Sequence, residues 1–249
     1  MKLSIIIPAY NEEASIEEIV KRVQRAVIPG IEREILVVDD GSKDRTAEIA
    51  SRLAGIRLLR HERNAGKGAA VKSGIRACTG DLVLVQDADL EYDPADHAAV
   101  IRPILERRCD AVMGSRFLLY RPRFIGKRRS PYLTHYIGNM LIVTFTNLLY
   151  GKAFTDYEGC YKAFARADLE SLRVSADGFE YDNELVCKLF RKGLRFEEVP
   201  IHYSPRTYAR GKKITWRHGV IMLWTIVKWR IAPLASFAVP RPAQTRRRA

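Results

Sequence analysis

An apolar run that ends in alternating acids constrains this chain more than any other stretch. Leu82 to Val85 has the length and composition of a buried parallel strand. Three acids follow it at alternate positions, Asp87, Asp89 and Glu91. Carboxylates spaced in this way can converge on one cation, and open α/β sheets bind ligands at the carboxyl ends of their strands. The stretch predicts an Mg²⁺ or Mn²⁺ site there, or, alternatively, only a strand-to-helix turn capped by Asp93.

The chain up to about residue 115 alternates apolar runs with helical periodicity. We expect four further apolar runs to be strands: Leu3 to Ile7, Glu34 to Val38, Ile56 to Leu59 and Ala111 to Gly114. Segments with apolar residues at helical spacing lie between them, beginning near Ala14 for the first helix. This order predicts a mostly parallel, Rossmann-like α/β sheet flanked by helices.

Polar residues follow several of these strands. Asp39 and Asp40 end the second strand and can accept hydrogen bonds from a base and a ribose, although Asp40, Ser42 and Asp44 fit helix-capping roles equally well. Lys67 lies in a glycine-containing loop that opens a helix. This loop lacks the first glycine and the Ser/Thr of a P-loop, so it predicts a cation near a ligand rather than that motif.

Two long segments in the second half are apolar but not uniformly so. The first, 132–150, follows the basic stretch 121–129 and contains too many polar residues for a good bilayer span, so we expect an amphipathic helix. The second begins near Thr215. Its apolar stripe predicts either a membrane-surface helix or a helix that covers the sheet. The stripe consists of Trp216, Val220, Leu223, Trp224, Val227 and Ile231.

Length and charge limit the remaining possibilities. The 249 residues fit one large domain, which we expect to span 1–231, followed by a disordered basic tail at 232–249. The net charge of +13 predicts an acidic partner. The four cysteines have no paired spacing, so neither a zinc site nor a disulfide framework is indicated. The apolar run near the first residue is too short for a signal peptide.

Several motifs, taken together and in order, resemble the family 2 glycosyltransferases of the GT-A fold. They resemble the branch that includes dolichyl-phosphate mannosyltransferases and polyprenyl-phosphate glucosyltransferases. The motifs are IIIPAYNEE at 5–13, VVDDGSKDRT at 37–46, NAGKGAAVKSG at 64–74, QDADLEYDP at 86–94, GSR at 114–116, TDYEGCYKAF at 155–164 and EVPIHYSPRTYARGKKI at 198–214.

The resemblance implies roles for particular residues. Those expected to bind the nucleotide-sugar donor are Pro8, Ala9, Tyr10, Glu12, Asp39, Lys67 and Asp87. Those expected to bind Mg²⁺ or Mn²⁺ are Asp87, Asp89 and Glu91. Those expected to position the acceptor phosphate or the diphosphate are Arg116, Arg129, Arg206 and Lys212. Asp156 is a candidate for orienting the acceptor or the sugar, so the expected catalytic set is Asp89, Arg116, Asp156 and Arg206.

The reaction that the resemblance implies is an inverting, metal-dependent transfer of a hexose to a polyprenyl or dolichyl phosphate. The donor stays open between UDP and GDP sugars, because Glu91 and Tyr92 stand where mannosyl enzymes of the branch usually carry Gln and His. We expect a cytoplasmic enzyme, peripheral at the cytosolic face of the membrane, with no transmembrane helix and no nucleic-acid partner. The alternative is a saccharide or other non-lipid acceptor, for which Asp156, Glu158 or Glu180 can serve as the base.

Overall fold

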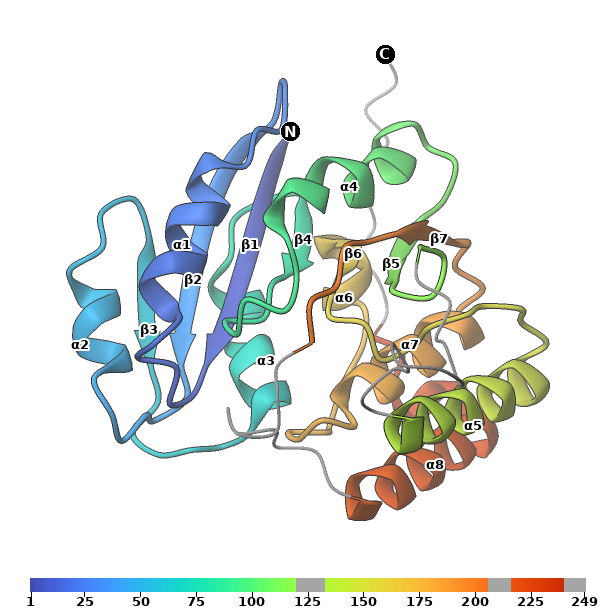
Figure 1. Cartoon of the computed structure of the whole chain (residues 1–249). Coiled ribbons are helices and arrows are strands. Elements are labelled where there is room, and N and C mark those ends of the chain that lie inside the picture. The colour runs from blue at the N-terminus through green and yellow to red at the C-terminus, as the bar shows by residue number, and fades with distance from the viewer. Residues whose placement is uncertain (120–132, 206–215, 240–249) are drawn as a thin grey trace, which may run out of the picture.

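The computed structural model describes residues 1–119, 133–205 and 216–239, and a seven-stranded mixed sheet forms its centre. Helices cover the sheet on both sides (Figure 1). Ile5, Ile6 and Ile7 are consecutive in the first strand and all fully buried, as expected for a strand that is covered on both faces. The predicted α/β sheet flanked by helices is confirmed.

The first half of the chain forms the parallel part of the sheet. Its elements are β1 (Lys2–Ala9), α1 (Ile16–Arg25), β2 (Glu32–Asp39), α2 (Thr46–Ser51), β3 (Arg57–Arg60), α3 (Lys67–Ala77) and β4 (Leu82–Val85). The strands lie in the order β3-β2-β1-β4, with every neighbouring pair parallel. Since β1 is flanked by β2 and β4, the residues that follow these three strands meet at one edge of the sheet.

The second half adds three strands and most of the remaining helices. Its elements are η1 (Pro94–Asp96), α4 (His97–Leu105), β5 (Ala111–Ser115), α5 (Leu133–Tyr150), β6 (Lys162–Ala165), α6 (Arg166–Glu170), α7 (Tyr181–Arg191), β7 (Phe196–Pro200), α8 (Trp216–Ile231) and η3 (Leu234–Ser236). β6 runs antiparallel between β4 and β5. The residues just before β6 therefore return to the same edge as the carboxyl ends of the parallel strands.

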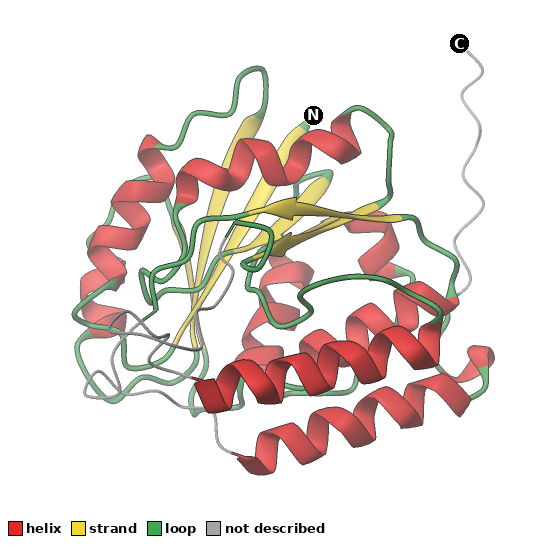
Figure 2. Ribbon diagram, turned by 45° about the vertical axis from the view of Figure 1, so that its right-hand side comes forward, coloured by secondary structure: helices red, strands yellow, loops and turns green. Residues whose placement is uncertain are grey.

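Helices α5 and α8 lie side by side below the sheet in Figure 2, and they are joined by contacts such as the Tyr150 hydroxyl donating to the Ile226 carbonyl at 2.9 Å. α8 buries Met222, Ile226 and Trp229. The stripe expected from the sequence is mostly on the other side, with Trp224 64% exposed and Ile231 75% exposed. In the part of the chain that the structure describes, no helix combines the length and apolarity that a membrane span needs.

Contacts with the core continue past residue 231, where the sequence predicts the end of the domain. Phe237 is fully buried and contacts Trp229 edge-on, with 5.6 Å between ring centroids. Its carbonyl accepts a hydrogen bond from Arg173 N at 2.8 Å, and Ala238 forms a β-bridge with Leu172. The sequence predicts a disordered basic tail at 232–249, and in the structure a buried aromatic side chain anchors 232–239 to the core. Residues 240–249 lie outside the described residues.

Candidate functional site

The residues expected to bind a donor gather where the strands of the parallel half end. Ala9 ends β1, Asp39 ends β2 and Asp87 follows β4 by one residue. Lys67 is the first residue of α3, and its Nζ lies 2.7 Å from Asp87 Oδ1. The fold thus brings together side chains that are up to 78 positions apart in the sequence. Of the predicted positions, Arg129, Arg206 and Lys212 lie outside the described residues.

Asp39 has an unsatisfied carboxylate oxygen at this edge. The residue is fully buried, and its Oδ1 accepts a hydrogen bond from Ser42 N at 3.3 Å. Its Oδ2 has no hydrogen-bond partner in the described structure, although Arg60 Nε lies 3.8 Å away. A buried polar atom without a partner is rare in proteins and often marks a ligand contact. The arrangement fits a carboxylate that accepts from a donor group of a ligand such as a nucleobase.

The neighbouring acids have structural roles instead. Asp40 accepts hydrogen bonds from Asn64 Nδ2, from Ala65 N and from Gly66 N, at 2.8 to 3.0 Å, and so fixes the loop that leads into α3. Asp44 Oδ1 accepts from Thr46 N at 2.9 Å, which ties down the start of α2. The sequence left a helix-capping role and a ligand role open for both acids. Neither is a cap, because the N-cap residues of α2 and α3 are Arg45 and Gly66, and both acids hold the segments that lead into these helices.

Alternating charges line the floor of the site beside Asp87. Next to the Lys67–Asp87 pair, Lys162 Nζ lies 3.2 Å from Asp182 Oδ1, with Lys162 almost fully buried. Burial opposes the charged form of Lys67, but the carboxylates of Asp87 and Asp182 outweigh this effect and raise the pKa of Lys67. Burial likewise opposes the charge of Asp87, yet Lys67 lowers the pKa of that carboxyl. Both groups therefore stay ionised at neutral pH.

Lys162 and Asp182 were not singled out by the sequence analysis. Lys162 occupies the first position of β6 and Asp182 the second of α7, twenty positions further along the chain. Neither residue stands in a spacing that predicts a site. The available signals for Lys162 were the motif at 155–164, which contains it, and its charge in the first position of an otherwise apolar strand.

The acids Asp87, Asp89 and Glu91 have the chemistry that a divalent cation requires, since Mg²⁺ and Mn²⁺ prefer oxygen ligands. Leu90 has a φ of 62°, a conformation that side chains other than glycine adopt rarely, and Glu91 N donates to Asp89 Oδ1 at 3.2 Å. Within the described ranges, no three His, Cys, Asp or Glu side chains are grouped to hold a metal ion. Mg²⁺ is usually bound by only one or two carboxylates plus substrate phosphates, so these residues fit a cation that arrives with a diphosphate.

Arg116 and Asp156 form the other side of the site. Arg116 Nε donates to Asp156 Oδ2 at 2.7 Å and Arg116 Nη2 donates to Asp156 Oδ1 at 2.8 Å, a bidentate pair. The guanidinium also lies against the rings of Phe117 and Tyr203, 5.3 and 5.2 Å from their centroids. Glu198 accepts from Asp156 N at 2.9 Å and so holds the segment that carries the pair. The Arg116 side chain is therefore fixed rather than mobile.

The remaining carboxylates proposed as a base also have partners. Glu158 Oε1 accepts from Asn183 Nδ2 at 2.8 Å, and burial raises the pKa of Glu158 despite that hydrogen bond. Glu180 Oε1 accepts from Gly178 N at 3.3 Å. With both oxygens of Asp156 bound by Arg116, each of the three candidate bases is engaged within the protein.

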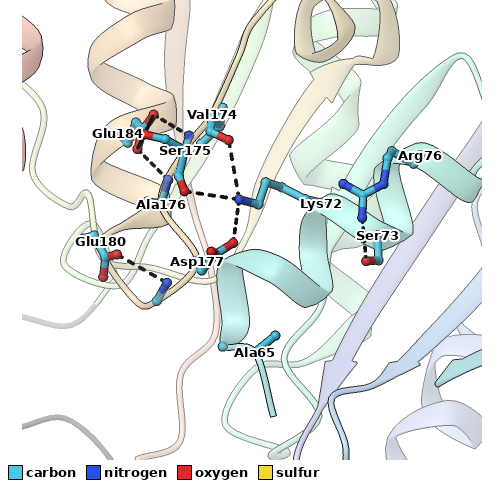
Figure 3. Close-up of polar contacts among 12 residues, drawn as sticks. Ala65, Lys72, Ser73, Arg76, Val174, Ser175, Ala176, Asp177, Glu180 and Glu184 are labelled. Atoms are coloured by element: carbon cyan, nitrogen blue, oxygen red, sulfur yellow. Dashed lines mark hydrogen bonds and ion pairs between the residues drawn. The ribbon is translucent and has the colours of Figure 1, made fainter. Parts of the chain in front are cut away.

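A seam of polar contacts holds α3 against the segment before α7. Figure 3 shows Lys72 Nζ pointing to Asp177, whose Oδ1 lies 2.7 Å away, and to the carbonyls of Val174 and Ser175. Gly68 lies in the same seam, where a Cβ would come within 2.6 Å of the Tyr181 side chain. The seam brings the starts of α3 and α7, and with them Lys67 and Asp182, to one place.

A cavity of about 520 Å³ opens on the outer side of this seam, between α3 and the loop after β3. Its lining includes Arg63, Lys72 and Arg76 but none of the residues expected to bind the donor. His61, also in the lining, contacts Asp40 rather than Asp39. Arg60 is in the lining as well, and its Nε lies 3.8 Å from Asp39 Oδ2, so the cavity adjoins the tip of β2.

Comparison with known proteins identifies the family. The model of the family described as "Glycosyl transferase family 2" matches residues 4–173, which include β1 to β6 except for the first two residues of β1. The chain belongs to this family. As a member of glycosyl transferase family 2 it is an enzyme, a glycosyltransferase, and the resemblance noted from its motifs is confirmed.

Two relatives within family 2 have names that refer to dolichyl or dolichol phosphate. A UDP-N-acetylglucosamine–dolichyl-phosphate N-acetylglucosaminyltransferase of Methanococcus voltae is 30% identical over 233 residues, which cover 84% of this chain and 89% of that protein. A dolichol-phosphate mannosyltransferase of Pyrococcus furiosus is 38% identical over 121 residues. The latter match spans 47% of this chain and 34% of the relative, so it compares only part of each protein.

The fold is shared with solved structures. Glucosyl-3-phosphoglycerate synthase from Mycobacterium tuberculosis, crystallised with Mn²⁺, UDP and phosphoglyceric acid, superposes with a TM-score of 0.71 over 93% of this chain and 79% of that one. The sequence identity is 22%. The expected GT-A fold of this family 2 enzyme is thereby confirmed.

Proposed function

We propose that the enzyme transfers a hexose from a UDP- or GDP-linked sugar to a polyprenyl or dolichyl phosphate, with inversion at the anomeric carbon and with a divalent metal. The observation that carries the proposal is the bidentate Arg116–Asp156 pair, which holds a guanidinium just after β5, at the sheet edge where the Lys67–Asp87 pair follows β4. The names of the Methanococcus and Pyrococcus relatives support a lipid phosphate as acceptor.

The donor half of the site would bind the nucleotide. The buried Asp39 carboxylate accepts from the base, and the residues around it, Pro8, Ala9, Tyr10 and Glu12, surround the nucleoside. Lys67 offers an ammonium to the diphosphate. Asp87, Asp89 and Glu91 are the residues that would hold Mg²⁺ or Mn²⁺, and the cation would stabilise the negative charge on the departing nucleoside diphosphate. Uracil and guanine both present an imide N–H to a carboxylate, so Asp39 accommodates either base.

The acceptor half would bind a phosphate. An oxygen of the acceptor phosphate forms the new bond to the anomeric carbon, while the bond from that carbon to the donor diphosphate breaks on the opposite side. A phosphate oxygen is already anionic at neutral pH, so no protein base has to remove a proton. A reaction without a protein base agrees with the structure, in which the three candidate bases are already hydrogen-bonded to other groups of the protein. They are Asp156, Glu158 and Glu180. Arg116, together with Arg129, Arg206 and Lys212, would position the phosphate.

The exposed apolar side chains of α5 and α8 favour a peripheral contact with a membrane, where a polyprenyl phosphate is found. They are Ile137, Leu141 and Leu148 on α5 and Val220, Ile221, Trp224 and Ile231 on α8. Exposed basic residues of α8, Lys228 and Arg230, accompany them. Tryptophan beside basic residues on a helix is typical of an interfacial segment that lies against anionic lipid.

The test is transfer of radiolabelled sugar from UDP-glucose, UDP-N-acetylglucosamine and GDP-mannose, each with Mg²⁺ or Mn²⁺, into organic-extractable polyprenyl phosphate. We expect label in the organic phase with one donor, and its loss with EDTA. Nucleotide binding that depends on metal, with no label in the organic phase from any donor, would contradict the lipid acceptor and favour a saccharide instead.

Asp89→Asn is expected to lower the transfer rate by roughly a hundredfold or more, since loss of a metal ligand removes stabilisation of the leaving group. Asp93→Asn is the matched control in the same loop. Asp93 Oδ1 accepts from Ala95 N at 3.0 Å, and asparagine caps equally well, so this variant should keep its activity. Equal rates in the Asp89 variant and the wild type, with both proteins folded, would refute the metal assignment.

A further inference from the structure

Asn139 presents an unsatisfied donor beside the Arg116–Asp156 pair. It lies on α5, and its Oδ1 accepts a hydrogen bond from Arg116 Nη2 at 3.4 Å. Its Nδ2 is buried from solvent and has no hydrogen-bond partner among the residues that the structure describes. A buried amide N–H without a partner destabilises the folded protein, so a position that keeps one needs an explanation.

The orientation of the Asn139 amide follows from chemistry. A guanidinium has only donors, so the group that faces Arg116 must be the amide oxygen. The Nδ2 end therefore points away from Arg116 and cannot be satisfied by rotating the amide, because rotation would place two donors against each other. Both Asp156 oxygens are bound by Arg116, and they are not the partner either.

We infer that Asn139 Nδ2 donates to an oxygen of the acceptor phosphate, next to Arg116. The inference rests on the proposed function, since it takes the Arg116 side of the site to be the phosphate subsite. The missing partner has to be an acceptor, and an anionic oxygen drawn to the Arg116 guanidinium lies beside the same amide. Asn139 then has two roles, holding Arg116 through Oδ1 and binding the phosphate through Nδ2.

The two roles are separated by Asn139→Asp. Aspartate keeps the shape of the side chain and an oxygen for Arg116, but it replaces the N–H donor with an oxygen that repels a phosphate. We expect the affinity for farnesyl phosphate, measured calorimetrically with UDP and Mg²⁺ present, to fall by about 10- to 100-fold, the usual effect of losing a hydrogen bond to a charged group. Asn139→Ser, which removes the amide, should weaken the affinity as well. The affinity for UDP should not change.

Asn147, two turns further along α5, is the matched control. Its Nδ2 donates to the Phe154 carbonyl at 2.8 Å, and its Oδ1 accepts from Phe154 N at 3.1 Å. Asn147→Asp should therefore lower the thermal stability and leave the affinity for farnesyl phosphate unchanged. Asn139→Asp should show the reverse, because no partner of Nδ2 is lost within the protein.

Three results would count against the inference. If wild type and Asn139→Asp bind farnesyl phosphate equally, Asn139 only holds Arg116, and the inference is wrong while the proposed function stands. If Asn139→Asp loses stability as Asn147→Asp does, with no change in affinity, its role is structural. If wild type binds no farnesyl phosphate and transfers no label to polyprenyl phosphate, the lipid acceptor is wrong and the inference fails with it.

Discussion

At the scale of single residues, His97 makes the stability of this enzyme sensitive to acid. The side chain is fully buried, its Nε2 lies 2.9 Å from Gln86 Oε1, and its Nδ1 has no partner within the described part of the chain. Burial lowers the pKa of His97 to about 3. In the unfolded chain the ordinary histidine pKa, near 6.5, applies. Between these two pKa values His97 is protonated in the unfolded chain but neutral in the folded protein. The stability contributed by neutral His97 is therefore lost as the pH falls below about 6.5.

We expect the free energy of unfolding, measured with urea, to decrease from pH 7 to pH 5 in the wild type. In His97→Gln this decrease should be smaller by about 2 kcal/mol. Glutamine does not titrate and retains a donor for Gln86. Parallel pH profiles for wild type and His97→Gln would contradict the assignment.

At the scale of elements, the apolar residues of α8 can either pack against the protein or contact a membrane surface. Met222, Ile226 and Trp229 pack against the protein, so the exposed Trp224 and Ile231 are not needed for folding. We expect Trp224→Glu to reduce sedimentation with vesicles that contain anionic lipid by about tenfold, while the thermal midpoint changes little. Val27→Glu replaces a side chain that is 76% exposed in the loop after α1, and it should leave vesicle binding unchanged. Equal loss in both variants would indicate a general charge effect.

The helices and strands also show which parts of the fold can be predicted from the sequence. The strands of the first half are predicted to within two residues, and β4 without error, because buried parallel strands are continuous apolar runs. The face that α8 buries is not predictable in this way, since a helix with apolar residues all round has no single stripe. The antiparallel place of β6 depends on pairing between distant segments, which leaves no local signal.

The same limit applies to the site. The stretch around Asp87 and the Lys67 loop carry local patterns, so their convergence follows from the rule that parallel strands end at one edge. The Lys162–Asp182 pair and the unsatisfied Asn139 amide arise only from packing of β6, α7 and α5. Lys162 belongs to the motif at 155–164, but no local pattern pairs it with Asp182 or indicates the role of Asn139.

At the scale of the whole molecule, the extent of the folded unit is set by the segment after α8. Val239 N donates to the Ser171 carbonyl at 2.9 Å and Phe237 fills a fully buried position, so 232–239 closes the core beside α6 and α7. Two truncated chains, ending at Val239 and at Ile231, differ only in this segment. We expect the shorter one to be less stable by about 3 to 5 kcal/mol, the usual cost of removing a buried aromatic side chain.

The measurement is urea unfolding of both truncated chains, with Phe237→Ala in the longer one as a check on the cause. Most of the loss should reappear in that single substitution, since the backbone contacts of the segment add less than the buried ring. Because the lost stability is a large fraction of what a domain possesses, the chain that ends at Ile231 should also unfold at a lower temperature. Equal midpoints for the two chains would show that the segment is attached to the core without stabilising it, and would return the domain boundary to the end of α8.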